Sequence, residues 1–213
     1  FNIRSIDAVL YKINDLSEKF IYFNDDMFLI KKSSPQEWFI ENKAVLSGNW
    51  AKTYNIQPLK KISNMIKHVF KIRPSYNAAQ SRSANIAGFK SEYFRSYHSG
   101  RPQIKSIIKS FYEKNPDMLK KQLKHKFRND KQYMPYSLCW HLLIKEEKYV
   151  KVSKSKLVEI EKIRDYTPHK LKKLLSELDN NEEVKLLNIQ DLNYASEDTS
   201  MVFKNWFFNK LTN

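Results

Sequence analysis

Apolar positions along the amino-terminal part of the chain change from a helical to a strand-like spacing. Within residues 5–16 the apolar residues recur every three to four positions, which predicts an amphipathic helix. The next run, "FIYF" at residues 20–23, is aromatic and β-branched, which predicts a strand. A helix followed directly by a strand is typical of an α/β layer.

The remaining pattern predicts more helix than strand. Helices are expected over residues 55–70, within 73–90, over 103–112 followed by a second helix that runs to 127, over 136–144, over 157–178 with a cap and first turn at Thr167-Pro168, and over 202–211. A second short strand is expected within residues 183–193, "EVKLLNIQDLN". The predicted fold class is therefore α/β, a helix-rich domain around a modest mixed sheet.

Length and cysteine content narrow the class of protein. With 213 residues the chain is long enough for one sizeable domain, or for a compact core with an appendage. The single cysteine, Cys139, excludes an internal disulfide framework and a multi-cysteine zinc site, and it fits a reducing compartment. No apolar run is long enough to span a membrane. Because the chain starts without methionine and already inside an amphipathic pattern, we expect it to be a piece of a longer protein.

The charge is strongly positive. Lys and Arg number 38 against 23 Asp and Glu, a formal net charge of +15. Such an excess attracts anions, whether nucleic acid, a phospholipid surface or a phosphorylated sugar. A well-solvated lysine-rich surface explains the same numbers, so charge alone does not choose among these partners.

Three polar residues, Asn24, Asp25 and Asp26, follow the first predicted strand before apolar residues resume. Carboxylates are costly to bury unless they are paired or bind a metal ion. One explanation is an ordinary exposed turn. The other is a site at the carboxyl end of the strand, where hard oxygens bind a divalent cation such as Mg²⁺.

Two further stretches contain groups suited to phosphate chemistry. In "YHSGRP", His98 precedes a Ser-Gly loop and Arg101, which pairs a proton acceptor with a planar guanidinium fork. In "HKFRNDKQ", Arg128 could clamp a diphosphate or cap the end of a helix. The other histidines lie in helical patterns and are expected to be structural or solvated: His68, His125, His141 and His169.

The second predicted strand also ends in polar groups, Gln190 and Asp191. Two strand ends that bear acids could converge on one cation. This second acidic strand end therefore strengthens the interpretation of the first as a site.

These four stretches, in this order, resemble the Stealth family of hexose-1-phosphate transferases, which includes bacterial capsule polymerases and the lysosomal-enzyme N-acetylglucosamine-1-phosphotransferase of animals. "FNIRSIDAVLYKINDLSEKFIYFNDDMFL" resembles the second conserved region of that family. "QSRSANIAGFKSEYFRSYHSGRP" and "KSFYEKNPDMLKKQLKHKFRNDKQYMPYSLCWHLL" resemble the third, and "LLNIQDLNYASEDTSMVFKNWFFNKL" is similar to the fourth. The resemblance divides one partial catalytic domain, 1–213, into the second region at 1–45, the third at 78–150, a helical insertion at 151–183 and the fourth at 184–213.

The chain departs from the family pattern in three places. The first conserved region, which contributes to nucleotide-sugar binding and would complete the sheet, would precede Phe1. Gln190 stands where the family usually has Asn, although Asp191 keeps the acid. Gln132 stands where an acid is frequent after the arginine.

The resemblance implies a glycosyltransferase-like fold and transfer of a sugar-1-phosphate from a nucleotide diphosphate sugar to an acceptor sugar hydroxyl, which forms phosphodiester-linked capsular or exopolysaccharide. Catalytic roles are expected for Asp25, Asp26, His98 and Arg128. Substrate or phosphate contacts are expected from Asn2, Arg4, Asn24, Gln80, Arg101 and Gln190. The expected ligands of Mg²⁺ or Mn²⁺ are Asp25, Asp26 and Asp191.

The expected partners are a nucleotide-sugar donor and an oligosaccharide or polysaccharide acceptor. The expected location is the cytoplasm of a bacterium, with peripheral association at the anionic inner face of the membrane. The alternatives are a basic nucleic-acid-binding module and a catalytically inactive homologue. The first leaves acids at strand ends unexplained, because they repel phosphate without a cation, and we therefore expect no nucleic-acid partner.

Overall fold

The computed structural model describes residues 2–57, 59, 62–63, 66, 75–152 and 156–212. The chain divides into two compact units, each built from separate stretches of sequence. Unit 1 contains Phe1–Ile21, Trp38–Tyr97 and Arg101–Val152. Unit 2 contains Tyr22–Glu37, His98–Gly100 and Ser153–Asn213. Helices and strands occur in both, so the predicted α/β class is confirmed.

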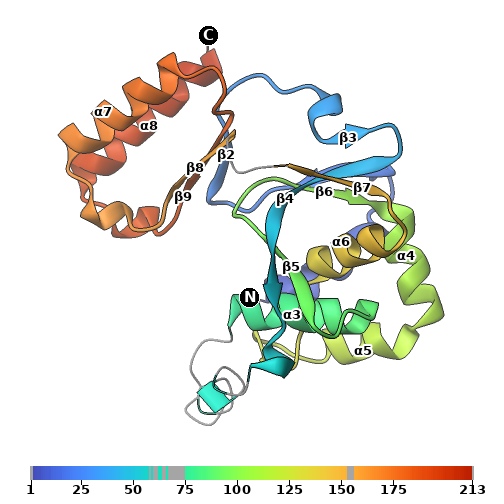
Figure 1. Cartoon of the computed structure of the whole chain (residues 1–213). Helices are drawn as coiled ribbons and strands as arrows, with labels where there is room; N and C mark the ends of the chain where they lie inside the picture. The colour runs from blue at the N-terminus through green and yellow to red at the C-terminus, as the bar shows by residue number, and fades with distance from the viewer. Residues whose placement is uncertain are drawn as a thin grey trace. The chain divides into compact units, whose positions relative to one another are not determined.

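Unit 1 is organised around one long strand, β4 (Figure 1). Its strands are β1 (Lys19–Tyr22), β3 (Phe39–Ile40), β4 (Lys43–Lys52), β5 (Glu92–Ser96), β6 (Arg101–Ile104) and β7 (Tyr149–Val152). Its α-helices are α1 (Ile3–Asp7), α3 (Tyr76–Ala87), α4 (Lys105–Lys114), α5 (Pro116–Leu123) and α6 (Pro135–Lys145), with short 3₁₀ helices at Leu10–Lys12 and Tyr54–Ile56. Strand β4 pairs antiparallel with β3 and β5 and parallel with β7, whereas β1 pairs with β6. The sheet is therefore mixed, as the sequence predicted.

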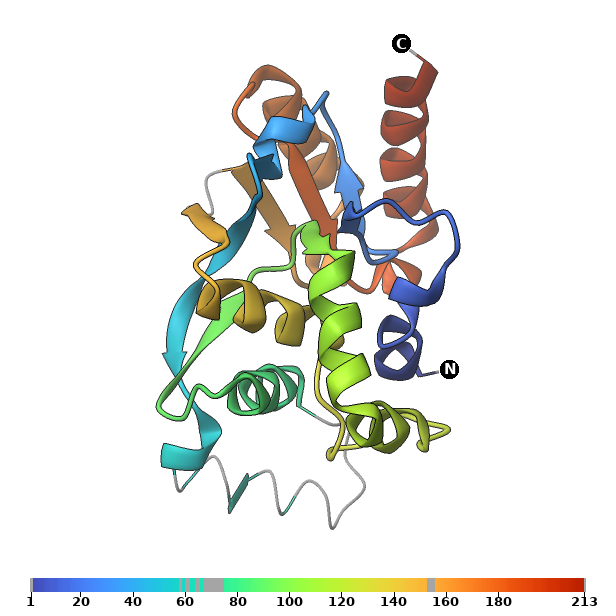
Figure 2. The ribbon, with the colours of Figure 1, turned by 90° about the vertical axis from the view of Figure 1, so that its right-hand side faces the viewer.

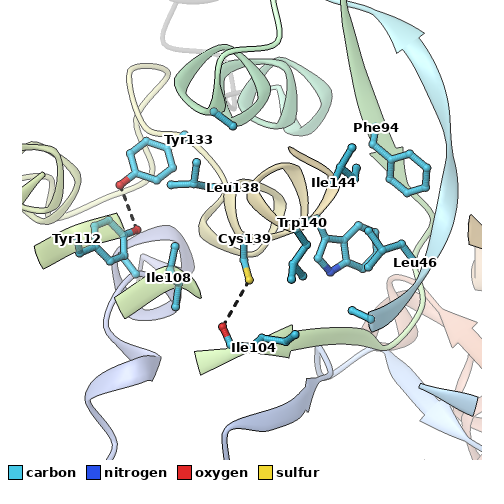
Figure 3. Packing of buried hydrophobic residues seen from close by; sticks show 14 residues of the cluster. Leu46, Phe94, Ile104, Ile108, Tyr112, Tyr133, Leu138, Cys139, Trp140 and Ile144 are labelled. Carbon is cyan, nitrogen blue, oxygen red and sulfur yellow. Dashed lines mark hydrogen bonds between the residues drawn. The ribbon is translucent and has the colours of Figure 1, made fainter. Parts of the chain in front are cut away.

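The core of unit 1 forms around helix α6, which is buried on nearly all sides. Figure 3 shows Trp140 and Cys139 of this helix among side chains from β4, β5 and α4. The indole Nε1 of Trp140 donates a hydrogen bond of 2.8 Å to the carbonyl oxygen of Pro102. Trp140 is therefore a central residue of this core, with only 1% of it exposed.

Unit 2 is a small sheet covered on one face by two helices. Its elements are β2 (Met27–Leu29), β8 (Leu157–Ile160), α7 (Pro168–Asn180), β9 (Leu186–Ile189) and α8 (Glu197–Thr212), with 3₁₀ helices at Pro35–Glu37, Ile163–Asp165 and Leu192–Tyr194. The strand order is β2-β9-β8, with β2 antiparallel to β9 and β8 parallel to it (Figures 1 and 2). Leu175, Leu187 and Phe203 are buried between the sheet and the helices, and the rings of Phe28 and Phe203 meet edge-on at 4.9 Å.

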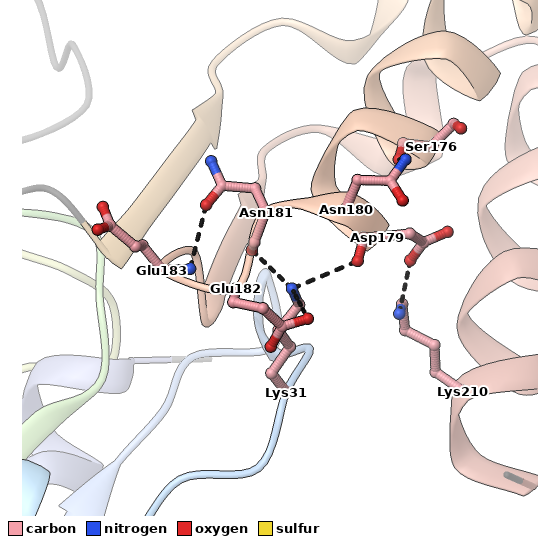
Figure 4. Close-up of polar contacts among 8 residues, drawn as sticks. All are labelled: Lys31, Ser176, Asp179, Asn180, Asn181, Glu182, Glu183 and Lys210. Atoms are coloured by element: carbon pink, nitrogen blue, oxygen red, sulfur yellow. Dashed lines mark hydrogen bonds and ion pairs between the residues drawn. The ribbon is translucent and has the colours of Figure 1, made fainter.

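Two lysines bind the ends of the helices of unit 2 (Figure 4). The Nζ of Lys31 donates to the carbonyl oxygen of Asn181 at 2.6 Å and to the Glu182 carboxylate at 3.2 Å, which fixes the segment between α7 and β9. Lys210 on α8 forms an ion pair of 2.6 Å with Asp179 on α7, and Asp179 also accepts from Trp206 Nε1 at 2.9 Å.

Several predicted elements differ from the structure. The continuous helix over 5–16 is wrong: α1 ends at Asp7, and two of the apolar residues at helical spacing, Ile6 and Ile13, are 42% and 52% exposed. Residues 157–160 form strand β8 rather than the start of a helix, because parallel pairing with β9 satisfies their main chain. The predicted second helix after residue 112 is confirmed as α5, but it ends at Leu123 rather than at residue 127.

The other predictions are largely confirmed. The strands at 20–23 and within 183–193 correspond to β1 and β9, and the helices at 73–90, 103–112, 136–144 and 202–211 correspond to α3, α4, α6 and α8. Thr167 caps α7 by accepting a hydrogen bond of 3.2 Å from the Lys170 N–H. The helix expected over 55–70 falls mostly outside the described residues, as does His68.

Candidate functional site in unit 2

The segment Asn24–Asp26 lies beside the carboxyl end of β9. Because β2 and β9 are antiparallel, with Met27 opposite Asn188, the start of β2 meets the end of β9. The Ile189 N–H donates a hydrogen bond of 2.9 Å to the carbonyl oxygen of Asp26. The two acid-bearing strand ends predicted from the sequence, Asn24–Asp26 and Gln190-Asp191, therefore lie at the same end of one small sheet.

The two adjacent aspartates have different environments. The Met27 N–H donates to the carbonyl oxygen of Asn24 at 3.2 Å, which closes a tight turn over Asp25 and Asp26. Asp25 is exposed, as expected of a turn residue, whereas the Oδ1 atom of Asp26 is buried and accepts no hydrogen bond. A turn and a candidate site therefore coincide, and Asp26 is the residue with an unexplained buried carboxylate oxygen.

Asn188 on β9 contributes a second buried oxygen without a hydrogen-bond partner. Its side chain is fully buried, and its Nδ2 donates a hydrogen bond of 2.8 Å to the carbonyl oxygen of Asp26. Its Oδ1 atom accepts no hydrogen bond. Leu187 and Ile189 pack in the core under the helices, so Asn188 points to the opposite face of the sheet. The sequence did not single it out, because its importance depends on the pairing of β9 with β2.

Glu159 of β8 is the other residue that the sequence analysis missed. It lies opposite Asn188 in the parallel β8–β9 pair. Its Oε1 atom accepts a hydrogen bond of 3.1 Å from the main-chain N–H of His98. The loop His98–Gly100 is thereby attached to the sheet of unit 2, with the imidazole of His98 half-buried.

Gln190 and Asp191 complete this end of the sheet. The Gln190 N–H donates a hydrogen bond of 2.9 Å to the carbonyl oxygen of Ile160. Asp191 is exposed and has a φ of 61°, a left-handed conformation that is uncommon outside glycine and that Asp tolerates better than most residues. The chain therefore turns sharply as it leaves β9, and Asp191 lies at this turn, two residues beyond the end of the strand.

The oxygens at this sheet end suit a divalent cation that binds substrate phosphate. Among the described residues, no three His, Cys, Asp or Glu side chains are grouped so that they could hold a metal ion. Mg²⁺ often needs fewer, because it keeps several waters and binds through one or two carboxylates plus substrate phosphates. The unsatisfied oxygens of Asp26 and Asn188 fit that mode.

The remaining predicted site residues belong to unit 1, where Gln80 and Arg101 are part of a buried polar network. The guanidinium of Arg101 lies 4.1 Å from the centre of the Tyr136 ring and donates to the Tyr76 hydroxyl at 3.1 Å. Gln80 Oε1 accepts from the Ser96 N–H at 2.9 Å, whereas its Nε2 atom is buried without a hydrogen-bond partner. Burial also raises the pKa of Tyr136 well above its usual range, so its hydroxyl stays protonated.

Asn2 and Arg4 have a visible structural role in unit 1. Arg4 donates to the carbonyl oxygens of Asn129 at 2.9 Å and Ser75 at 3.3 Å. Asn2 Nδ2 donates to the carbonyl oxygen of His125 at 2.8 Å and to Gln132 Oε1 at 3.1 Å. Both residues thus fix the segment after α5, and substrate contacts by them stay a prediction.

Arg128 lies in that same segment, five residues beyond the last residue of α5. It is half-buried and does not cap the helix, so the capping explanation is wrong. Its proposed contact with a diphosphate stays a prediction.

Comparisons with known proteins add to this geometry. No family model matches the chain. A capsular polysaccharide phosphotransferase of Neisseria meningitidis serogroup B is 55% identical over 42 residues, which are 20% of this chain and 11% of that protein. An exopolysaccharide phosphotransferase of Streptomyces coelicolor is 48% identical over 42 residues, 20% of this chain and 7% of that protein. An exopolysaccharide phosphotransferase of Lactiplantibacillus plantarum is 35% identical over 81 residues, 38% of this chain and 23% of that protein.

The chain is similar to capsular and exopolysaccharide phosphotransferases. The resemblance to polysaccharide phosphotransferases found in the sequence is thereby confirmed. In these three comparisons the match spans between 7% and 23% of the relatives' own length. Among the described residues, no helix has both the length and the apolar character needed to cross a membrane.

Proposed function

We propose that this chain takes part in transferring a sugar-1-phosphate from a nucleotide diphosphate sugar to the hydroxyl of an acceptor saccharide. The observation that carries the proposal is the pair of buried, unsatisfied oxygens of Asp26 and Asn188 at the end of the unit 2 sheet. Relatives named polysaccharide phosphotransferases support it, because phosphate transfer commonly uses a divalent cation and oxygen atoms are the ligands that Mg²⁺ prefers.

The proposed reaction forms one bond to phosphorus and breaks another. The acceptor hydroxyl oxygen attacks the phosphorus that carries the sugar, and the bond from that phosphorus to the oxygen bridging to the nucleoside phosphate breaks. The bridging oxygen leaves with the electron pair as part of the nucleoside monophosphate, and the hydroxyl proton passes to a base. The product is a phosphodiester between two sugars.

The residues of unit 2 have distinct roles in this proposal. Asp26 and Asn188 hold the oxygens that fix a divalent cation, Mg²⁺ or Mn²⁺, and this cation neutralises phosphate oxygens when it is bound. His98 accepts the hydroxyl proton, and Glu159 positions it by accepting its main-chain N–H. Asp25 and Asp191, both exposed, orient the acceptor or bind the outer side of the cation.

The residues of unit 1 and the surroundings of the protein complete the proposal. Arg101 and Arg128 contact phosphate oxygens through their planar guanidinium groups. Asn24 and Gln190 of unit 2 donate to the donor sugar or diphosphate, whereas a substrate contact by Gln80 of unit 1 stays a separate prediction. The partners are a nucleotide-sugar donor and a polysaccharide acceptor, and we propose that the reaction takes place in the cytoplasm at the anionic inner face of the membrane.

The test combines metal binding with turnover in the protein that carries this chain. We expect Asp26→Asn and Asn188→Leu each to weaken Mn²⁺ binding by about 10-fold or more, because each removes a ligand or its support. Titration calorimetry with Mn²⁺ alone measures this without any substrate. Asp15→Asn, a substitution of an exposed aspartate in unit 1, is the matched control and should bind Mn²⁺ normally.

Turnover is followed by phosphorus NMR with nucleotide sugars and saccharide acceptors. We expect His98→Ala to slow formation of the phosphodiester and of nucleoside monophosphate together by about 100-fold or more. Normal Mn²⁺ affinity and normal turnover in Asp26→Asn would contradict the assignment of this sheet end as the site.

A further inference from the structure

Unit 1 contains a pocket that none of the sequence-predicted site residues lines. It has a volume of about 310 Å³ and lies between helix α3, helix α5 and the segment that follows α5. This volume is near the lower limit of ligand pockets, about 300 Å³, so a phosphate with one sugar ring would fill it.

Cationic residues dominate the charged lining of the pocket, and Asp130 is the acidic residue that acts on Arg82 and His125. Arg82 from α3, Lys121 from α5, and Lys124 and Lys131 from the following segment line the pocket. Across the described ranges of the chain, no acidic side chain forms an ion pair with any of these three lysines, whereas Lys120 on the same helix pairs with Asp117 at 3.6 Å. These three lysines are exposed, so their side chains can bind an anion without first breaking an ion pair with a carboxylate.

The position of Arg82 is fixed from within the protein. Its Nη1 donates a hydrogen bond of 2.8 Å to the carbonyl oxygen of Gln132. Gln122 forms part of the wall and is fully buried, with its Nε2 bonded to the carbonyl oxygens of Arg4 and Tyr133, both at 3.0 Å. One side of the pocket is thus preorganised, and the exposed lysines form the adaptable side.

The inner surface of the pocket is apolar. Ile86, Met118 and Tyr133 line it. The Tyr133 hydroxyl donates a hydrogen bond of 3.1 Å to the Tyr112 hydroxyl. Only 3% of Tyr133 is exposed, so its ring offers no open face on which a nucleobase could stack. The C–H faces of a sugar ring need only aliphatic and edge contacts of the kind that Ile86 and Met118 supply.

We propose that this pocket binds the phosphodiester of the acceptor saccharide, with the four cationic side chains around the phosphate and one adjoining sugar ring on the apolar surface. The inference rests on the proposed function, because that reaction makes saccharides joined by phosphodiesters. A polymer that already contains phosphodiester linkages would bind the pocket through one of these negatively charged linkages. The pocket would then select elongated acceptors over short neutral ones.

His125 adds a pH dependence to this site. The pKa of His125 is lowered by partial burial and by Lys124 and Lys131, while Asp130 opposes the shift. The ring is therefore neutral near pH 7 and gains a proton as the pH falls, which adds a fifth cation to the lining beside Arg82 and Lys121. A phosphodiester keeps one negative charge in mildly acidic solution, so its binding should tighten as the pH falls below the ordinary histidine pKa of about 6.5.

The binding test uses a disaccharide whose two sugars are joined by a phosphodiester, and calorimetry with this chain. We expect the double substitution Lys124→Ala with Lys131→Ala to raise Kd by about 10-fold or more, because each lysine contributes a charge-assisted hydrogen bond. Lys172→Ala with Lys173→Ala on α7 removes the same charge from exposed positions of unit 2 and should leave Kd unchanged. His125→Gln should remove the tightening at low pH.

Three results would overturn the proposal. One is equal affinity for the same disaccharide joined by a neutral glycosidic bond. The second is an unchanged Kd in the Lys124/Lys131 double variant. The third is a nucleoside monophosphate that binds this pocket more tightly than the diester, which would make it a nucleotide pocket.

A turnover measurement separates failure of this inference from failure of the proposed function. In the protein that carries this chain, the double variant should raise KM about 10-fold for an acceptor with an internal phosphodiester, and not for a neutral acceptor. If turnover occurs and KM is the same for both acceptors, only the pocket assignment falls. If the diester binds but no phosphodiester product forms with any acceptor, only the proposed function falls.

Discussion

Single buried polar residues show how the sequence constrains this fold, and His141 on α6 is the clearest case. Its Nε2 accepts a hydrogen bond of 2.9 Å from the Phe94 N–H, so that nitrogen cannot carry a proton. Its Nδ1 lies 2.6 Å from the Ser137 carbonyl oxygen, so Nδ1 is the protonated nitrogen. The neutral imidazole is therefore required, and burial lowers the pKa of His141 to about 4.

This pKa predicts that acid destabilises the fold. Above the ordinary pKa of about 6.5 both folded and unfolded forms are neutral and stability is unaffected. Between about 6.5 and 4 the unfolded chain binds a proton that the folded chain excludes, so the free energy of unfolding falls by up to about 3 kcal/mol. Urea unfolding followed by tryptophan fluorescence from pH 7.5 to 4 measures the loss.

Two variants identify the residue responsible for that loss. His141→Gln should show a smaller dependence on pH across this window, at the cost of a weaker bond to the Phe94 N–H. His169→Gln, at an exposed position on α7, is the matched control and should keep the wild-type dependence. The assignment fails if His169→Gln removes the dependence and His141→Gln does not.

Residues of the candidate site differ in how far sequence alone could identify them. Asp25 and Asp26 stood out because two acids interrupt an apolar run. Asn188 and Glu159 did not, since an amide and an acid within strand-forming segments are unremarkable until β8, β9 and β2 are paired in register. Their roles depend on partners far away in sequence, which local patterns do not contain.

At the scale of elements, the sequence predicted helix α3 from its local cap residues. It did not predict strand β4, whose formation depends on pairing with strands that are distant in sequence. Ser75 accepts a hydrogen bond of 3.3 Å from the Ala78 N–H at the start of α3, and Gly88 ends the helix with a φ of 108°. Strand β4, "KAVLSGNWAK", mixes small, polar and apolar residues because three different strands pair with it. Its pattern therefore reflects several neighbours and matches no single period.

Gly48 in β4 provides a test of how closely β4 and β5 approach. A Cβ atom at this position would lie 2.4 Å from the Arg95 carbonyl oxygen and 2.7 Å from the Phe94 side chain. Because backbone cannot move aside as a flexible side chain can, we expect Gly48→Ala to cost about 1–3 kcal/mol of unfolding free energy. Urea unfolding measures this loss, and amide chemical shifts in β5 report the displacement.

Gly88→Ala is the comparison for this substitution. Its Cβ would meet only the flexible end of Lys145 at 3.7 Å, so its cost comes from the left-handed backbone, about 1–2 kcal/mol. Only Gly48→Ala should shift the β5 amides. Unchanged β5 shifts in Gly48→Ala would show that the two strands are farther apart than described.

At the scale of the whole molecule, each of the two units has its own large hydrophobic core among the residues that the structure describes. Leu143 on α6 is fully buried in the core of unit 1, and Leu175 on α7 is 1% exposed in the core of unit 2. Each core draws on segments that are distant in sequence, and unit 2 combines residues near 28 with residues 157–207. Length was consistent with one sizeable domain or with a compact core and an appendage, because length sets how much core is possible and not how it is divided.

Because each unit has its own core, a cavity made in one core should lower the local stability of that unit more than that of the other. Leu175→Ala should cost about 2–5 kcal/mol of local stability, since it removes buried methyl groups and leaves a void. Hydrogen exchange should then accelerate at Leu187 and Ile189 of β9, whose amides lie in unit 2, more than at the amides of β5. Leu143→Ala is the matched substitution in unit 1 and should give the reverse order, with β5 affected most.

If both variants accelerate exchange equally in β5 and β9, the two cores unfold as one cooperative structure. The candidate site at the end of β9 would then depend on the packing of α6 as much as on its own helices.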